Sequence, residues 1–198
     1  MNSRVFDVVC SLVGLILLTP FFLVLILLIK LDSAGPAFFR QMRVGQYGNP
    51  FRIVKFRTMV AQSESAGPKI TRAGDSRITK LGRVLRKYKL DELPQLINVL
   101  LGDMSLVGPR PEVPEYIQYY TAKQREILDV KPGITSYASL LFKTEEQSLR
   151  DVNNVEEIYI KETLPKKLDI ELLHISRNSS VVTKLRLIVQ TLYGIFSE

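Results

Sequence analysis

The longest run of hydrophobic positions in the chain lies near its N-terminus. Val8 to Ile29 spans 22 residues without one charged side chain. As a helix rising 1.5 Å per residue, this run would be roughly 33 Å long, enough to cross the hydrocarbon core of a bilayer. The charged residues that flank it at its two ends are Arg4, Asp7, Lys30 and Asp32. The pattern therefore predicts a membrane helix, and the run is long for the hydrophobic region of a signal peptide.

The dipeptide Thr19-Pro20 lies in the middle of this run. Proline removes one helical hydrogen bond and clashes with the preceding turn, so we expect a kink there. A kinked helix that returns to the face from which it entered would keep both charged flanks in water on one side. Because kinked spanning helices are common, the residues alone favour a spanning helix and leave the re-entrant alternative open.

Two short strands are predicted after this helix, over Pro36–Val44 and Phe51–Met59. They are joined by a turn-rich segment, residues 45–50, as in a β-hairpin. Successive side chains of a strand point to opposite faces, so Lys55 and Arg57 would share one face and Phe56 would occupy the other. This pair of cations could hold a diphosphate, or it could be an ordinary solvated face.

The rest of the pattern is mainly helical. Ser76 is expected to cap one helix, and Asp91 a second that ends at Gly102-Asp103. Further helices are predicted over 115–130, 145–164, 166–174 and 181–196. The helix over 145–164 should break near residues 153–154 and end before Pro165. The last is amphipathic and could lie in the membrane interface or against the core. The expected fold class is α+β, mostly helical, with one small β-hairpin.

An acidic pair, Asp91 and Glu92, stands just ahead of Pro94 and an apolar run. A basic segment precedes the pair and contains Arg83, Arg86, Lys87 and Lys89. Nearby cations and a helix N-terminus both favour ionised carboxylates. Such a pair suits a site for a metal ion and phosphate, although the same residues could be a helix cap beside surface charges.

A second candidate is Arg110, which stands between Pro109 and Pro111. The two prolines restrict the backbone on either side, so residues 104–111 are not expected to form a regular helix or a central strand. A rigid loop that presents a guanidinium suits bidentate contact with phosphate. A structural turn with an exposed arginine is the alternative.

Length, charge and residue counts limit the number of domains and the kinds of partner to expect. The 198 residues predict one domain, and the net charge of +7 indicates an anionic partner: a phosphate ligand, lipid headgroups or nucleic acid. No nucleic-acid-binding motif is recognised. Cys10 is the sole cysteine, so there is no intrachain disulfide, and the sole histidine, His174, cannot build a histidine metal site.

Several motifs occur together and in order along almost the whole chain. Besides Thr19-Pro20 they are Lys55-Phe56-Arg57-Thr58-Met59, Asp75-Ser76-Arg77-Ile78-Thr79, Leu90-Asp91-Glu92-Leu93-Pro94, Gly108-Pro109-Arg110-Pro111 and Lys131-Pro132-Gly133-Ile134-Thr135. In this order the set resembles the bacterial sugar transferases known as monotopic phosphoglycosyl transferases, in a minimal catalytic form. The resemblance implies transfer of a phosphosugar from a UDP-sugar to polyprenol (undecaprenyl) phosphate, with release of UMP and with Mg²⁺ as cofactor. It implies a ping-pong mechanism through an aspartyl-phosphosugar intermediate.

The resemblance also assigns residues. It makes Asp91 the nucleophile and a Mg²⁺ ligand, and Glu92 its catalytic partner. The residues expected to contact phosphate or nucleotide are Lys55, Arg57, Arg86, Arg110, Pro111, Lys131 and Lys143. Many relatives have arginine where this chain has Lys131, and Lys143 takes the place of another arginine. A lysine keeps the charge but lacks the planar fork of donors.

The resemblance changes the expected topology. It implies a re-entrant helix over residues 1–32, broken at Thr19-Pro20, and a catalytic domain over 33–198. That domain would lie at the cytoplasmic face of the bacterial inner membrane, with interfacial helices such as the tail. The implied partners are the UDP-sugar, the polyprenol phosphate, membrane lipid and, as an open possibility, a second copy of the chain, with no nucleic acid. A membrane-anchored scaffold without turnover is the alternative function.

Overall fold

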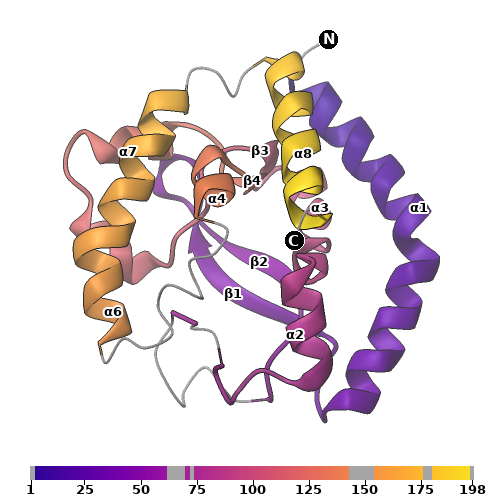
Figure 1. Cartoon of the computed structure of the whole chain (residues 1–198). Helices are drawn as coiled ribbons and strands as arrows, with labels where there is room; N and C mark the ends of the chain where they lie inside the picture. The colour runs from indigo at the N-terminus through magenta and orange to yellow at the C-terminus, as the bar shows by residue number, and fades with distance from the viewer. Residues whose placement is uncertain (1–2, 62–69, 72–73, 143–153, 176–179, 197–198) are drawn as a thin grey trace.

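Two small β-sheets organise the fold (Figure 1). The first is an antiparallel hairpin of β1 (Phe38–Val44) and β2 (Pro50–Phe56). The second is a parallel pair, β3 (Ser105–Val107) and β4 (Gly133–Thr135). The computed structural model describes residues 3–61, 70–71, 74–142, 154–175 and 180–196. The predicted hairpin is therefore confirmed, with strands somewhat shorter than expected.

The second sheet was not predicted, because residues 104–111 were not expected to form a regular helix or a central strand. The prolines at 109 and 111 follow β3 and leave its backbone free to pair. The two strands approach so closely that a Cβ atom on Gly133 would lie 2.0 Å from the backbone nitrogen of Gly108. Ser105 N–H donates to Pro132 O at 2.8 Å, and Gly133 N–H to Pro109 O at 2.9 Å. Only glycine permits this backbone contact.

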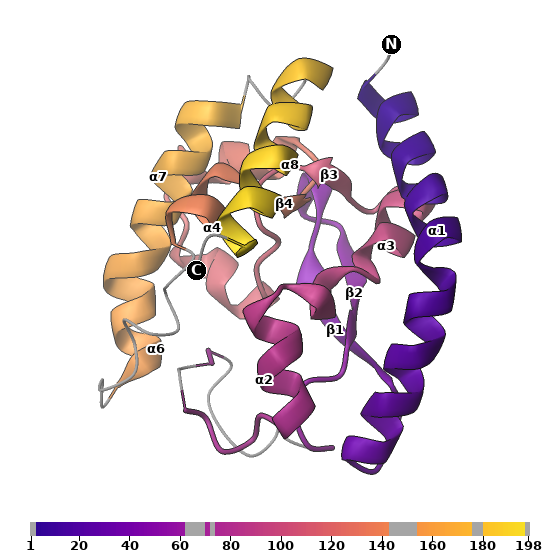
Figure 2. The same ribbon diagram turned by 45° about the vertical axis from the view of Figure 1, so that its right-hand side comes forward.

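The apolar run forms one continuous helix, α1 (Ser3–Asp32), with Pro20 inside it. Figure 2 shows that α1 is bowed and is not divided into two separate helices. The side chain of Thr19 donates to Leu15 O at 2.7 Å, on the turn that precedes the proline. Within the described part of the chain, α1 is the helix long and apolar enough to cross a membrane.

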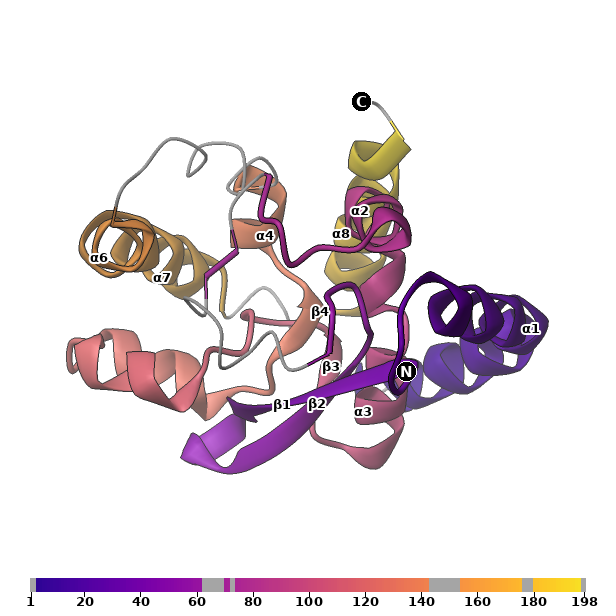
Figure 3. The same cartoon turned by 90° about the horizontal axis from the view of Figure 1, so that it is seen from below.

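Both ends of α1 contact the same domain. Near its start, Arg4 donates to Val99 O at 2.7 Å and to Leu100 O at 3.2 Å. At its end, Asp32 accepts a hydrogen bond from Leu81 N–H at 3.3 Å. Figure 3 shows α1 along one side of the molecule, with α6 and α7 on the opposite side. The helix therefore lies along the domain and does not project from it.

The remaining described elements are helical. They are α2 (Lys80–Lys87), η3 (Leu90–Glu92), α3 (Gln95–Leu101), η4 (Pro114–Tyr119), η5 (Gln124–Asp129), α4 (Tyr137–Leu141), α6 (Val155–Ile158), η6 (Tyr159–Thr163), α7 (Leu164–His174) and α8 (Val181–Phe196). The predicted bounds of the tail helix are confirmed by α8. The end of α3 at Gly102, with φ of 98°, is also as predicted.

Three helix boundaries differ from the prediction. Thr79, not Ser76, caps α2, and its side chain accepts a hydrogen bond from Gly82 N–H at 3.0 Å. The helix expected over 115–130 consists of two short 3₁₀ segments, η4 and η5. Pro165 does not end a helix: it lies at the start of α7, which follows the π-helical segment η6 without a gap. The predicted helical residues 145–153 lie outside the described part of the chain.

The core consists of three clusters, and α1 contributes to two of them. Phe6 joins the cluster between β2, α3 and β3, while Phe22, Leu25 and Ile29 join the cluster around Phe56. The third cluster packs η4 and η5 on α7. The rings of Phe22 and Phe56 meet edge to face, with centroids 5.1 Å apart. The long apolar helix α1 is thus part of the core of the domain.

Candidate active site

The acidic pair lies in η3, the short turn between α2 and α3. Lys89, which precedes it, has a left-handed backbone with φ of 53°, so the chain changes direction there. Asp91 and Glu92 are each only 7% exposed. The prediction that Asp91 caps a helix is wrong, because α3 begins after Pro94 and no side chain caps it.

A buried amide fixes α3 on the hairpin. Asn98 is 1% exposed, and its side-chain nitrogen donates to Arg52 O at 2.8 Å. Its side-chain oxygen accepts a hydrogen bond from Val54 N–H at 3.0 Å. The amide therefore pairs with the open edge of β2 as a further strand would. This contact places η3, at the start of α3, beside Lys55.

Glu92 binds two cations that come from different elements. The Lys55 ammonium on β2 lies 2.7 Å from Glu92 Oε1. Arg110, in the loop after β3, donates to the same oxygen at 2.8 Å. Burial alone would raise the pKa of Glu92, but Arg110, Lys55 and Lys89 outweigh it and hold that pKa well below its usual range. Glu92 is thus ionised over the whole physiological range.

The environment shifts the pKa of Asp91 in the opposite direction. Burial, and then the negative charge of Glu92, raise the pKa of Asp91 to about 6, against the opposing effect of Lys55, Arg86 and Lys89. One of its oxygens, Oδ1, is buried and has no hydrogen-bond partner. The nearby cations therefore favour the ionised form of Asp91 as expected, but burial and Glu92 outweigh their effect on its pKa. A pair of carboxyl groups with separated pKa values is typical of catalytic sites.

A hairpin residue that the sequence analysis missed fixes the loop that carries Arg110. Arg43 on β1 donates to Pro111 O at 3.1 Å and lies 3.9 Å from Glu112 Oε2. Glu112 in turn accepts a hydrogen bond from the hydroxyl of Tyr159. The signal that could have found Arg43 is its register: it pairs with Phe51, on the strand face that carries Lys55.

Most of these side chains line one narrow recess. Its walls are formed by Arg43, Ile53, Lys55, Gln95, Arg110, Pro111 and Gly133. Gln95 is 2% exposed and was also missed by the sequence analysis. The recess thus brings together three of the predicted residues, Lys55, Arg110 and Pro111, beside Glu92. It is a narrow space of about 10 Å³, lined by three cationic side chains that pair with Glu92 or Glu112.

The other predicted residues lie elsewhere. Arg86 donates to Thr58 Oγ1 at 2.9 Å and is near enough to lower the pKa of Asp91. Arg57 follows the end of β2 and binds backbone carbonyls around the end of α1, so it does not join Lys55 at Glu92. Lys131 lies beside Arg4, at the start of α1, where burial and that arginine lower its pKa. Lys143 lies outside the described residues.

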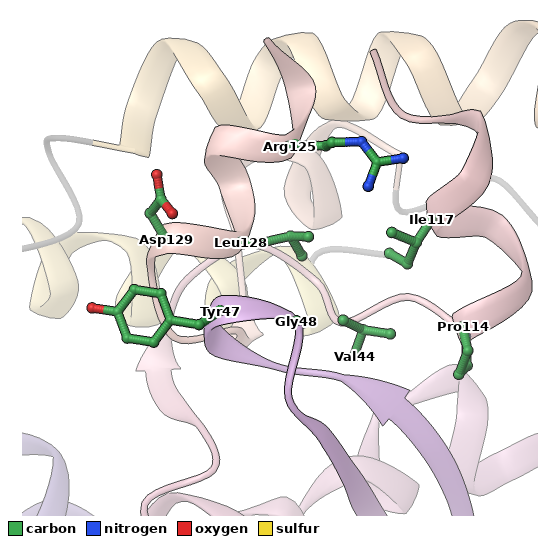
Figure 4. A pocket seen from close by; sticks show the side chains of 8 residues that line it. All are labelled: Val44, Tyr47, Gly48, Pro114, Ile117, Arg125, Leu128 and Asp129. Carbon is green, nitrogen blue, oxygen red and sulfur yellow. The ribbon is translucent and has the colours of Figure 1, made fainter. Parts of the chain in front are cut away.

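A larger groove opens at the far end of the hairpin. Figure 4 shows its lining, which comes from the hairpin turn, η4 and η5 and consists of Val44, Tyr47, Gly48, Pro114, Ile117, Arg125, Leu128 and Asp129. Its volume is about 610 Å³. None of the sequence-predicted site residues lines it, and Lys55 lies near the opposite end of the hairpin register. The groove is therefore separate from the acidic pair.

Comparison with known proteins gives the family. The model of the family described as "Bacterial sugar transferase" matches residues 1–198. The chain belongs to the bacterial sugar transferase family. This transferase is 46% identical over 145 residues to a UDP-glucose:undecaprenyl-phosphate glucose-1-phosphate transferase of Caulobacter vibrioides. That match covers 71% of the chain and 54% of the relative.

Two further relatives are similar to this chain over about the same length. A sugar transferase of Bacillus subtilis, EpsL, whose function is uncharacterized, is 44% identical over 138 residues, covering 70% of the chain and 67% of the relative. An Aeromonas hydrophila UDP-N-acetylgalactosamine-undecaprenyl-phosphate N-acetylgalactosaminephosphotransferase is 42% identical over 144 residues, covering 70% and 34%. The chain therefore spans about half of the Caulobacter relative and a third of the Aeromonas one.

The pKa of Asp91 leads to a prediction about stability. A buried carboxyl whose pKa is raised on folding destabilises the protein above that pKa, and the penalty disappears as pH falls below the unfolded value of about 4. We expect Asp91→Asn to raise the melting temperature in detergent at pH 7.5 and to leave it unchanged at pH 4. The matched control is Asp129→Asn, which removes an exposed carboxylate. A melting temperature at pH 7.5 equal to that of the control would contradict the raised pKa.

Proposed function

We propose that the chain transfers a phosphosugar from a UDP-sugar to undecaprenyl phosphate, producing UMP and a polyprenyl-diphosphate-sugar. The names of the Caulobacter and Aeromonas relatives describe reactions of this class. The observation that carries the proposal is the buried pair Asp91 and Glu92, whose pKa values are shifted in opposite directions beside cations. A site of this kind can keep one carboxylate as a fixed anchor and leave the other to react.

The reaction proceeds in two displacements at one phosphorus atom. Asp91 attacks the sugar-bearing phosphorus of the donor, an oxygen–phosphorus bond forms, and UMP leaves with the electrons of the broken diphosphate bond. A phosphate oxygen of the acceptor then attacks the same phosphorus, and the Asp91 carboxylate leaves. A covalent intermediate divides one transfer into two easier steps. With a pKa of about 6, Asp91 is largely ionised at neutral pH and more basic than an ordinary carboxylate.

The cations of the site offset the repulsion between carboxylate and diphosphate. Glu92 holds Lys55 and Arg110 in fixed positions, so no side-chain reorganisation is required when the phosphates arrive. Arg110 is the more accessible of the two, with 37% of its side chain exposed. We assign Lys55, Arg86 and Arg110 to the phosphates of the donor, with Pro111 shaping the recess.

Mg²⁺ is the expected cofactor, and Asp91 has one oxygen atom that suits a metal ligand. Its buried Oδ1 has no hydrogen-bond partner and could serve as a ligand. No cluster of three acidic, cysteine or histidine side chains occurs among the described residues. Mg²⁺ is commonly bound through one or two carboxylates together with substrate phosphates and water, which agrees with this donor set. When bound, the ion supplies positive charge at the diphosphate.

We further propose that the domain sits at the cytoplasmic face of the bacterial inner membrane. A straight helix of 30 residues is roughly 45 Å long, so crossing a bilayer would put its ends on opposite faces. Here Arg4 and Asp32 both contact the same domain, which supports a helix that enters and leaves on one side. The outward side of α1 is apolar and exposed along its length, including Val5, Val9, Leu12, Ile16, Leu17, Leu23, Leu27 and Leu31.

The tail helix extends this apolar surface. Lys184 on α8 binds both carboxylate oxygens of Asp7 on α1, at 2.7 and 2.9 Å, and both residues are 3% exposed. Ser105 donates to the same carboxylate at 2.8 Å. The exposed apolar side chains of α8 are Val182, Leu185, Val189, Leu192 and Tyr193. We propose that α8 lies in the membrane interface beside α1, where the lipid acceptor is supplied.

The covalent step is tested by UMP release in the absence of acceptor. Wild-type protein given UDP-glucose or UDP-N-acetylgalactosamine, the donors named for its relatives, should release UMP up to one equivalent of enzyme. The rate should fall as pH drops through about 6, since Asp91 becomes protonated. Asp91→Asn should release none, while Asp129→Asn behaves as wild type. UMP release by Asp91→Asn at the wild-type rate would overturn the proposal.

Membrane topology is tested by cysteine labelling in inverted and right-side-out vesicles. With Cys10 changed to serine, Asn2→Cys and Ser33→Cys place single thiols just outside the two ends of α1. Both should react with an impermeant maleimide only in inverted vesicles, because both ends lie on the cytoplasmic side. Reaction of the two thiols from opposite faces would show that α1 spans the bilayer.

A further inference from the structure

Arg57 occupies an unexpected place for a residue of a phosphate-binding motif. It directly follows β2, is only 6% exposed, and donates to three backbone carbonyls at the end of α1. The distances are 2.9 Å to Ala34 O, 3.1 Å to Ile29 O and 2.5 Å to Ser33 O. Its own N–H donates to Ala37 O at 2.8 Å. The side chain is therefore committed to the backbone that leaves the membrane helix.

The physics of a helix end explains these contacts. The last four carbonyls of a helix have no intrahelical partner and carry partial negative charge. Of the three carbonyls that Arg57 binds, Ile29 O lies in the last turn of α1 and also accepts a hydrogen bond from Ser33 N–H at 3.3 Å. The other two, Ser33 O and Ala34 O, belong to the segment that follows the helix. A guanidinium has five donors and no acceptor, so one arginine can bind several carbonyls and complement the helix dipole together.

Gly35 makes room for this arrangement. Its φ is +121°, which side-chain-bearing residues rarely adopt, and a Cβ atom there would lie 2.3 Å from Arg57 Nη1. A side chain at position 35 would thus displace the guanidinium without removing its charge. The contact between Arg57 and the end of α1 can therefore be broken in two independent ways, by replacing Arg57 or by adding a side chain at position 35.

The neighbours of Arg57 connect it to the active site. Two residues earlier, Lys55 binds Glu92. Phe56 is 1% exposed and packs on Phe22 of α1, and Thr58 accepts a hydrogen bond from Arg86. The four consecutive residues 55–58 therefore bind, in turn, the acidic pair, the side of the membrane helix, its end, and α2. A displacement of α1 would be transmitted to Lys55 through this short segment.

We propose that Arg57 is a positioning residue, not a substrate ligand: it holds the end of the membrane helix against the strand that carries Lys55. The proposal rests on the two-step transfer proposed above. The donor enters from water and requires the acidic pair and its cations. The acceptor lies in the bilayer, so its phosphate must meet the site at the position that α1 fixes. Arg57 therefore serves the second displacement more than the first.

Two variants and one control distinguish a positioning role of Arg57 from a role as a phosphate ligand. Arg57→Gln removes the charge, Gly35→Ala displaces it, and Arg52→Gln removes an exposed arginine of the same strand. Each full-length protein is placed in vesicles of phosphatidylethanolamine and phosphatidylglycerol. Three quantities are measured: acceptor-free UMP release from UDP-glucose or UDP-N-acetylgalactosamine, the KM for undecaprenyl phosphate, and amide hydrogen exchange over residues 29–37.

A positioning role predicts the same result for Arg57→Gln and Gly35→Ala. Acceptor-free UMP release should stay within about twofold of wild type, and the KM for undecaprenyl phosphate should rise about tenfold or more, as expected for a misplaced substrate. Amide hydrogen exchange over residues 29–37 should become faster in both variants, because the backbone carbonyls there lose their hydrogen bonds from Arg57. Arg52→Gln should match wild type in all three measurements.

A different pattern would overturn the proposal. If Arg57 were a phosphate ligand, Arg57→Gln would lose acceptor-free UMP release while Gly35→Ala kept it. Unchanged hydrogen exchange in both variants would also refute the contact, whatever the activity. If the wild-type protein released no UMP without acceptor, the two-step mechanism would fail, but the exchange measurement would still decide whether Arg57 holds the helix end.

Discussion

The structure depends on one buried carboxylate that two cations share. Glu92 binds Lys55 from the hairpin and Arg110 from the loop after β3, so three separate parts of the chain must meet at its side chain. Removing either cation would leave a charge buried without full compensation, which is costly. The same arrangement creates the chemistry of the site. Burial of the turn, and then the charge of the ionised Glu92, raise the pKa of Asp91 to about 6.

The long apolar helix α1, which we propose as the membrane helix, is also a structural part of the domain. Its inner side supplies Phe6, Phe22 and Ile29 to the core, and its start is fixed by the buried contact between Asp7 and Lys184. Its outer side is apolar and exposed. One helix thus has two apolar surfaces, of which only one faces the protein. If the outer side contacts lipid, as we propose, this arrangement fixes the position of the acidic pair relative to the lipid surface, which suits the proposed transfer from a water-soluble donor to a lipid acceptor.

Much of the fold and part of the site could be predicted from the sequence. Local patterns were sufficient for the hairpin and for the bounds of α8, and they singled out the acidic pair, whose catalytic role stays a prediction. They failed where a partner is distant in the chain. The parallel pairing of β3 with β4 depends on contact between Gly108 and Gly133, and the carbonyl partners of Arg57 are set by the end of α1. Arg43 was missed because its partners, Pro111 and Glu112, are brought to it only by folding.

The most direct test of the account is a ¹³C NMR titration of the carboxyl groups of Asp91 and Glu92 in lipid nanodiscs. Selective labelling, with Asp91→Asn and Glu92→Gln to assign the two signals, gives each group its own titration curve. The account predicts a midpoint near pH 6 for Asp91 and a pKa of Glu92 well below that of an ordinary glutamate, because Arg110, Lys55 and Lys89 stabilise its ionised form. Two midpoints together near pH 4, as for ordinary exposed carboxyl groups, would contradict it.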